Sequence, residues 1–163
     1  MYQVGDQVVH PMHGAGVIVG HVSRKVNGVI REYYQMKPPC GSMMVMIPVD
    51  HVHNIGVRPV ICRTEADRIM ELLSSEEVDM AQNWNHRYRE NMLRLKSGNL
   101  EEVARVVKGL LLRDRIKNLS TGERKMLHFA KEILISELVL AQNLSYEEVE
   151  ESIQVRTLQG VVR

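Results

Sequence analysis

The spacing of hydrophobic and polar residues changes near residue 62 of the chain. Before that point, short runs rich in β-branched residues are separated by glycine, proline or asparagine, which is typical of strands joined by tight turns. After it, apolar residues recur every three or four positions, the period of amphipathic helices. The sequence therefore predicts an α+β protein, with a β domain over residues 1–60 and an all-α domain over residues 61–163.

The first 60 residues contain five candidate strands. Asn27-Gly28 is a strong hairpin signal, because both residues tolerate positive φ. Residues 37–42 include two prolines and a glycine and are expected to form a loop. Five short strands in so few residues predict a small, strongly bent barrel of the SH3 or Tudor type. The predicted strands are residues 4–9, 17–22, 31–36, 43–47 and 57–61.

The helical part carries several helix-end signals. Ser120 with Glu123, and Ser145 with Glu148, have the spacing of a capping box, and Gly98 has the position of a left-handed C-cap. Thr64 with Asp67 is a related start signal. The predicted helices are residues 64–73, 83–96, 100–117, 121–142 and 146–154.

The only tryptophan, Trp84, begins the second of these helices. A helical wheel gives an apolar core face and a polar row beside it: Tyr88, Met92 and Leu95 in the first, Arg87, Asn91 and Arg94 in the second. Trp84 falls between them, at a helix N-terminus whose free N–H groups attract phosphate. Apolar wedges supported by cations are a known device in the DNA minor groove. Spacing alone leaves a second interpretation open, in which Trp84 packs in the core and the cations are solvated.

Charge is distributed unevenly behind a formal net charge of +1. Residues 84–131 contain twelve lysines and arginines against five acidic residues, whereas residues 61–83 and 132–163 each contain two against six. A cationic block headed by an aromatic ring favours a nucleic-acid partner.

Other kinds of chemistry have little support in the sequence. The seven histidines show no H-E-x-x-H spacing and the two cysteines, Cys40 and Cys62, form no C-x-x-C motif, so neither a metal site nor a cofactor is expected. The Gly14–Gly16 turn lacks the lysine of a phosphate loop, and no nucleophile motif predicts an enzyme. No apolar run approaches the length of a membrane span, and the first residues do not have the pattern of a signal peptide. We therefore expect reduced thiols and a cytoplasmic protein.

At this level of detail the chain resembles the CarD family (CarD/CdnL-like) of bacterial RNA polymerase-binding transcription regulators, and its first part is similar to the polymerase-interacting module of transcription-repair coupling factor. The resemblance covers nearly the whole chain. It is carried by the opening segment Val4–Gly16, by Asn83–Tyr88 with the Ser97-Gly98 that follows, and by Leu119–Leu127.

The resemblance implies a function and a set of site residues. It implies that the β domain is Tudor-like and binds the RNA polymerase β subunit, and that the helical domain contacts promoter DNA at the upstream edge of the transcription bubble. There, without reading base sequence, a tryptophan wedge in the minor groove would stabilise the open promoter complex. The implied DNA-binding residues are Trp84, Asn85, His86, Arg87, Arg89, Arg124 and Lys125. The implied polymerase-binding residues are Arg24, Val45, Met46, Ile47 and Pro48.

Two positions depart from the family pattern. Met46 stands where relatives carry an arginine, which suggests a more apolar polymerase contact. His86 stands where they carry another basic residue, which should weaken phosphate binding at neutral pH. We expect a monomer that reaches the nucleoid through polymerase, with a strand-swapped dimer as an alternative. A second functional hypothesis also stays open: an adaptor of the transcription machinery whose basic helices bind protein and never touch DNA.

Overall fold

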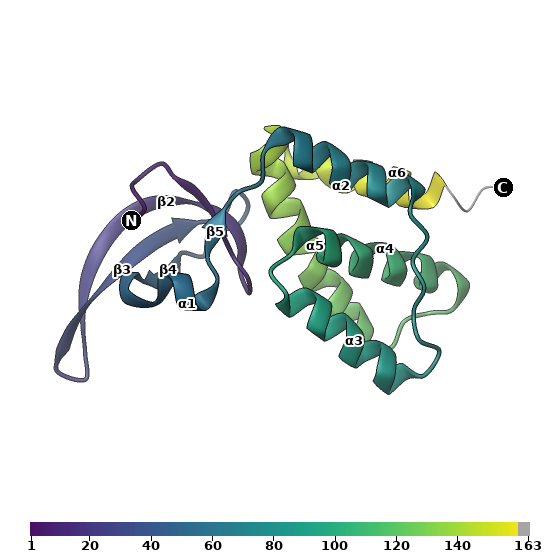
Figure 1. The fold of residues 1–163 in the computed structure, drawn as a ribbon, viewed down its shortest axis with the longest axis horizontal. Helices are drawn as coiled ribbons and strands as arrows, with labels where there is room; N and C mark the ends of the chain where they lie inside the picture. Colours follow the sequence, from purple (N-terminus) through teal and green to yellow (C-terminus); the bar gives the residue numbers. More distant parts are fainter. Residues whose placement is uncertain (160–163) are drawn as a thin grey trace.

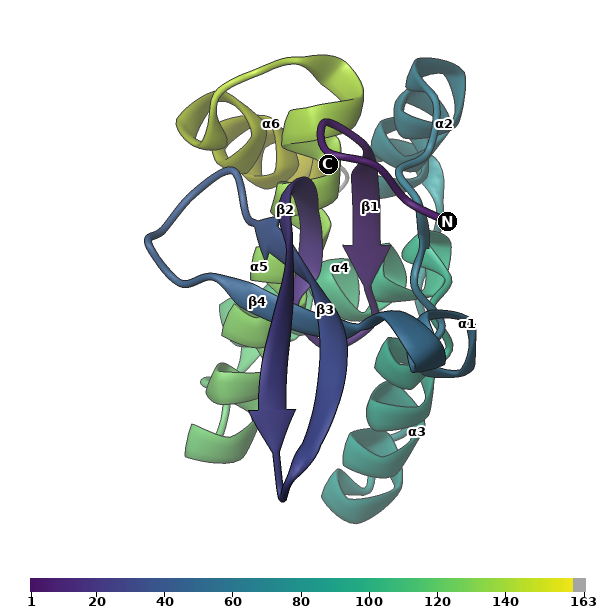
Figure 2. The ribbon, with the colours of Figure 1, turned by 90° about the vertical axis from the view of Figure 1, so that its left-hand side faces the viewer.

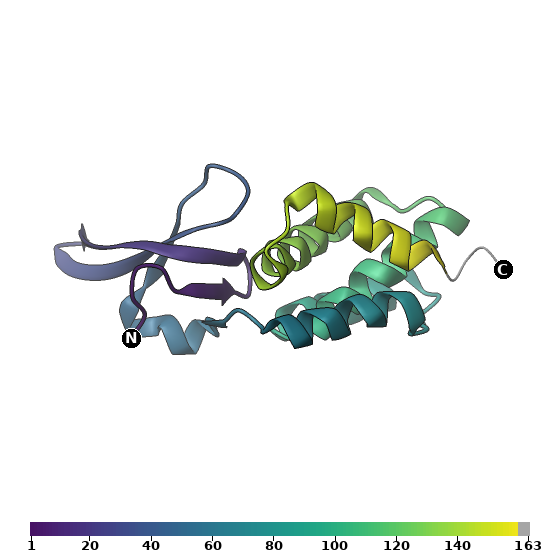
Figure 3. The same cartoon turned by 90° about the horizontal axis from the view of Figure 1, so that it is seen from above.

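A computed structural model describes residues 1–159 of the chain. Viewed along its shortest axis, the molecule is elongated, with a β-sheet at one end and a bundle of helices at the other (Figure 1). The same division is seen from above (Figure 3). Each part has its own cluster of buried apolar residues, centred on Ile18 and Met36 in the sheet and on Leu110 and Leu134 among the helices.

The sheet consists of five antiparallel strands in the order β4-β3-β2-β1-β5. The helices lie behind it when it is viewed face-on (Figure 2). Its strands are β1 (Gln7–His10), β2 (Gly14–Val26), β3 (Val29–Lys37), β4 (Val45–Pro48) and β5 (Arg58–Pro59).

The prediction of a closed barrel is wrong, because β4 and β5 are the two edges of an open sheet. The segment between them forms a 3-10 turn over Val49–His51 and the short helix α1 (Val52–Ile55) instead of extending either edge. β5 has only two residues, and Pro59 has no N–H group to continue a strand ladder. Barrel closure therefore lacks a strand long enough to bridge the edges.

The hairpin between β2 and β3 confirms the turn prediction. Val26 pairs with Val29, and the two residues between them, Asn27 and Gly28, have φ values of 52° and 80°. Both lie in the region that a two-residue type I′ turn requires. A β-bulge between Ile18 and Gly20 shifts the register of this long pair of strands, whose outer half extends beyond the rest of the sheet.

Five longer helices form the other end of the molecule, and their bounds match the predicted ranges closely except at the last helix. They are α2 (Arg63–Ser75), α3 (Trp84–Lys96), α4 (Leu100–Ile116), α5 (Thr121–Gln142) and α6 (Tyr146–Leu158). α6 continues past residue 154, where the prediction ended it.

The predicted caps had mixed outcomes. Ser145 and Glu148 form the complete reciprocal capping box at the start of α6. At α5, Ser120 caps the N–H of Glu123, but the Glu123 carboxylate bonds elsewhere, so that box is only half formed. The start signal at Thr64 is wrong, because the N-cap of α2 is Cys62 and makes no side-chain capping bond.

Candidate nucleic-acid interface

The N-termini of α3 and α5 meet at the side chain of Trp84. Asn83 caps α3 by accepting a hydrogen bond from the N–H of His86 at 3.1 Å, which places Trp84 in the first turn. The Trp84 side chain is 41% exposed. The indole is therefore neither sealed in the helical core nor free of contacts, and the interpretation in which it packs entirely inside the core is wrong.

Three neighbours hold the indole in one orientation. Its Nε1–H donates a hydrogen bond of 2.9 Å to Ser120 Oγ. One face stacks on Tyr88, with ring centroids 5.0 Å apart and planes 19° apart. A Cβ added at Gly122 would lie 3.5 Å from Trp84 Cζ2, an ordinary van der Waals distance, so the ring lies against the first turn of α5. An aromatic ring fixed in this way loses little side-chain entropy when a ligand stacks on it.

Beneath the indole, a buried ion pair joins α3 to α5. Arg87 is 2% exposed, and its Nε and Nη2 groups donate to the two Glu123 carboxylate oxygens at 2.7 and 2.9 Å. Its Nη1 donates to the carbonyls of Ala81 and Gln82, both at 3.0 Å. The hydrogen bonds to Glu123 raise the pKa of Arg87, and those from Arg87 lower the pKa of Glu123. Both side chains therefore stay charged in the interior.

This geometry corrects the helical wheel of α3. Its fully buried residues are Arg87, Asn91 and Leu95, four positions apart, whereas Tyr88 and Met92 are only partly buried. Arg87 has almost no accessible surface to offer a phosphate, so its implied role as a direct DNA contact does not fit the structure. Through Glu123 it instead joins the start of α3 to the start of α5.

The remaining implied DNA-binding residues are exposed and lie in the N-terminal halves of α3 and α5. Asn85 and Arg89 lie on α3, and Lys125 lies on α5. Arg124 donates from Nε to the Leu119 carbonyl at 3.2 Å, and its side chain is 55% exposed. His86 is also exposed, but its Nε2 lies 2.8 Å from a Glu90 carboxylate oxygen. Because that carboxylate offsets an imidazolium charge, His86 is a weaker phosphate ligand than an unpaired cation. Arg124 also has an acidic neighbour, with Asp114 Oδ1 at 3.7 Å from its Nη2.

Ser120, Tyr88 and Glu123 are the site residues that sequence reasoning missed. Tyr88 was assigned to the core face, and the other two to a capping box. The Ser120–Trp84 and Glu123–Arg87 contacts each join residues 36 positions distant in the sequence, whereas Tyr88 stacks on Trp84 within α3. The one available signal was the tight Ser120–Glu123 motif inside the basic block, because a capped helix N-terminus is itself a site for anions.

The implied polymerase-binding residues lie on the sheet. Pro48 pairs with Tyr33, Met46 with Gln35, and Arg24 with Arg31, so all of these side chains share the face away from the sheet core. Arg24 on β2 pairs with Arg31 of β3, and Pro48 on β4 pairs with Tyr33, two residues further along β3. By strand spacing, the backbone positions of Arg24 and Pro48 are therefore on the order of 10 Å apart. The structure thus brings Arg24, Met46 and Pro48 together.

Val45 and Ile47 alternate to the opposite face of β4. Ile47 is fully buried, opposite Tyr34, and Val45 packs against the same core. Their side chains stabilise the sheet, so only their backbone is available to a partner. β4 pairs with β3 on one side and is an edge strand on the other. An edge strand of this kind can accept a further strand from a partner.

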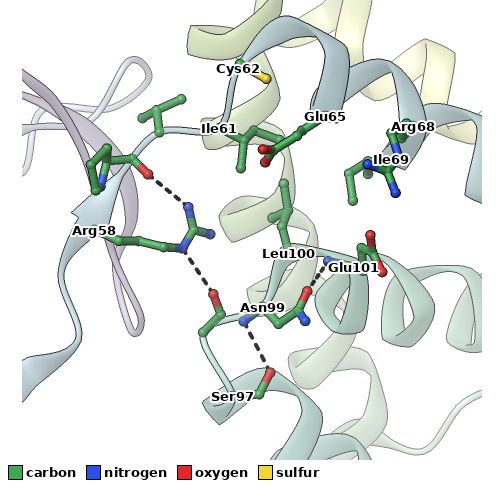
Figure 4. Close-up of a pocket in the computed structure, with 13 residues that line it drawn as sticks. Arg58, Ile61, Cys62, Glu65, Arg68, Ile69, Ser97, Asn99, Leu100 and Glu101 are labelled. Atoms are coloured by element: carbon green, nitrogen blue, oxygen red, sulfur yellow. Dashed lines mark hydrogen bonds between the residues drawn. The ribbon is translucent and has the colours of Figure 1, made fainter.

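Other features of residues 1–159 are less informative. No group of three or more histidine, cysteine or acidic residues within them could hold a metal ion. No helix in this range has the length and apolar character needed to cross a membrane. A cavity of about 560 Å³ lies between β5, the start of α2 and the α3–α4 loop, lined on the sheet side by Arg58 (Figure 4). Cys40 and Cys62 are exposed free thiols.

Comparison with known proteins gives a consistent assignment. The family model described as CarD, C-terminal domain, matches residues 68–154, and the model described as CarD-like/TRCF RID domain matches residues 2–61. A curated relative is "Putative transcription factor YdeB" from Bacillus subtilis (strain 168). It is 34% identical over 149 residues, which cover 91% of this chain and 97% of the relative.

Proposed function

The chain belongs to the CarD family, whose members are transcription factors and not enzymes, and from this premise we propose that it stabilises the open promoter complex. Its RID domain is an RNA polymerase-interacting module. In the proposal the sheet binds the polymerase β subunit, and the helical part contacts DNA at the upstream edge of the transcription bubble. The chain acts as a monomer and joins the nucleoid through polymerase.

The observation that carries the DNA-binding half of the proposal is the held, half-exposed indole of Trp84. A ring that only filled the core would be buried, and a ring without a fixed role would not need a hydrogen bond to Ser120, a stacked Tyr88 and a buried ion pair below it. Inserted at a base step in the minor groove, such a ring props the step open while Arg89, Arg124 and Lys125 contact phosphates. None of these groups reads a base edge.

Tethering supplies the affinity that the DNA contacts lack. A handful of phosphate contacts gives non-specific binding of only about 10⁻⁴–10⁻⁶ M at physiological salt. Binding of the sheet to polymerase makes the DNA contact effectively intramolecular and raises its occupancy. The indole then favours melted DNA by the difference between its affinities for melted and closed DNA.

The polymerase contact uses the outer face and edge of the sheet. Arg24 supplies a cation, Met46 and Pro48 supply apolar surface, and the β4 backbone is available for strand pairing. Met43 and Met44 are exposed just before β4 and extend the apolar character of this edge. Met46 in place of the family's arginine therefore suits a contact that depends more on burial than on charge.

The test is the half-life of open promoter complexes after challenge with a DNA competitor. Wild-type protein should lengthen it, Trp84→Ala should not, and both proteins should co-purify with core polymerase equally. Arg24→Glu should fail to co-purify and should have no effect on lifetime. A Trp84→Ala protein that lengthens the half-life as wild type does would favour the adaptor that never touches DNA.

A further inference from the structure

Helix α5 contacts both the Trp84 site and the sheet that carries the proposed polymerase-binding residues. At its N-terminal end, Ser120 accepts the hydrogen bond of the indole and Glu123 pairs with Arg87 of α3. Further along, Ile133, Ser136 and Glu137 meet the sheet. At 1.5 Å per residue, the distance along the helix between these two regions is about 20 Å.

Glu137 is the central residue of the contact with the sheet. It is 0% exposed, and its carboxylate oxygens accept hydrogen bonds from Arg58 Nη1 and Nη2 at 2.7 and 2.8 Å. The backbone N–H of Ile61 donates a third bond of 3.0 Å to the same carboxylate. A buried carboxylate with these partners favours a single arrangement of the groups around it, because any other arrangement would leave a charge unpaired.

Arg58 links the sheet to a second part of the helical bundle. Its Nε donates to the Gly98 carbonyl at 3.1 Å, in the loop between α3 and α4, as Figure 4 shows. This loop follows the C-terminal end of the helix that carries Trp84. One side chain on β5 is therefore bonded both to α5 and to the end of α3.

The turn between β1 and β2 makes a separate contact with α5. The N–H of Ala15 donates to Ser136 Oγ at 2.9 Å. Gly14 has φ +77°, and a Cβ there would lie 2.5 Å from Ser136 Oγ and 3.3 Å from Ile133 Cα. Both the backbone conformation and the close approach require glycine at this position.

We propose that Arg58 and Glu137 are positioning residues that fix the sheet on α5, and so set the distance and direction from the polymerase-binding edge to Trp84. This inference rests on the proposed function. Relative motion is the default for two units of one chain unless their interface is large and hydrophobic. A tether gives full advantage only when its geometry matches the span between the two binding sites. Neither residue is among those proposed to contact polymerase or DNA.

The variant that tests the proposal is Arg58→Ala, with Arg63→Ala, an exposed arginine at the start of α2, as the charge-matched control. Gly14→Ala disturbs the same junction but leaves Arg58 in place to pair with the Glu137 carboxylate. For both junction variants we expect co-purification with polymerase to be retained. The protein concentration needed for half-maximal open-complex lifetime should rise about tenfold or more, as pre-organisation is lost.

The geometry is measured directly with two spin labels. The labels are attached to cysteines introduced by Lys25→Cys near the tip of the β2–β3 hairpin and by Ile116→Cys at the end of α4. The two native cysteines are removed by Cys40→Ser and Cys62→Ser. Double electron–electron resonance should give a narrow distance distribution with Arg58 present and a broad one in Arg58→Ala. A narrow, unshifted distribution in both junction variants would overturn the proposal, whatever happens in the transcription assay.

The transcription assay separates this inference from the function on which it rests. If Trp84→Ala loses activity while Arg58→Ala and Gly14→Ala keep it despite broad distances, the positioning role is wrong and the proposed function stands. If Trp84→Ala keeps full activity, the proposed function has failed, and the distance distributions still decide whether Arg58 fixes the junction.

Discussion

Replacing Glu123 with glutamine should destabilise the helical end of the protein far more than a surface carboxylate would. The two side chains of the Arg87–Glu123 pair are each 2% exposed. Glu123→Gln keeps the shape of the side chain but leaves the Arg87 guanidinium in the interior without its counter-ion. The carbonyls of Ala81 and Gln82 can still accept from Nη1, but they cannot neutralise the charge.

The size of the effect follows from that burial. Removing one partner of a buried ion pair costs about 3–5 kcal/mol, and loss of an acidic residue from the first turn of α5 adds about 0.3–1 kcal/mol. For a chain of this length each kcal/mol lowers Tm by about 2–4 °C, so we expect a fall on the order of 10 °C. Glutamine keeps part of the hydrogen bonding, which places the result toward the lower end of the energy range.

Thermal unfolding followed by far-UV circular dichroism measures the shift. The matched control is Glu90→Gln, which removes a carboxylate from the exposed His86–Glu90 pair on the same side of the molecule and should cost about 0–1 kcal/mol. The double variant Arg87→Met/Glu123→Leu should recover most of the loss, because no unpaired charge remains. Equal shifts for Glu123→Gln and Glu90→Gln would show that the pair is not the buried support described here.

Three further predictions concern the same surface. Ser120→Ala should lower the free energy of unfolding by about 0.5–2 kcal/mol. It should also red-shift the fluorescence emission of the single tryptophan, because the indole N–H then bonds to water, whereas Ser120→Thr should preserve both properties. Unchanged emission in Ser120→Ala would contradict the hydrogen bond. Because Arg87 lowers the pKa of Glu123, the stability that the pair contributes should be complete above the unfolded carboxyl pKa of about 4.3. It should be lost as the pH falls through the lower pKa of the folded state. The free energy of unfolding, measured from pH 6 to pH 3, should show this loss in wild type and a smaller one in Glu123→Gln. Arg89→Ala and Arg124→Ala should each reduce the salt dependence of DNA binding in the polymerase complex by about 0.9 in log–log slope, and an unchanged slope would remove that residue from the phosphate contacts.

Local signals in the sequence predicted local structure well. The Asn27-Gly28 hairpin and the Ser145–Glu148 capping box form as expected, because each depends on the conformation of a few neighbouring residues. The helix bounds were recovered for the same reason. The closed barrel was not, because closure depends on how far two strands distant in sequence extend, and β5 stops at Pro59.

The candidate site was predicted in outline and misjudged in its interior. The exposed aromatic residue and the flanking cations could be located from composition and resemblance. The burial of Arg87 could not, because an arginine is normally assigned to the surface, and its partner Glu123 lies 36 residues away on another helix. The same limit applies to Arg58 and Glu137, whose pairing across 79 residues left no local signal.

The most direct test of the central claim is to map what lies next to the indole in a complex of polymerase, promoter and protein. Asn85, exposed in the same turn of α3, is replaced by the photoreactive residue p-benzoylphenylalanine, and the crosslinked nucleotides are identified. We predict crosslinks to DNA at the upstream edge of the bubble that require polymerase and disappear with Arg24→Glu. Crosslinks to protein alone, or to DNA equally well without polymerase, would contradict the account.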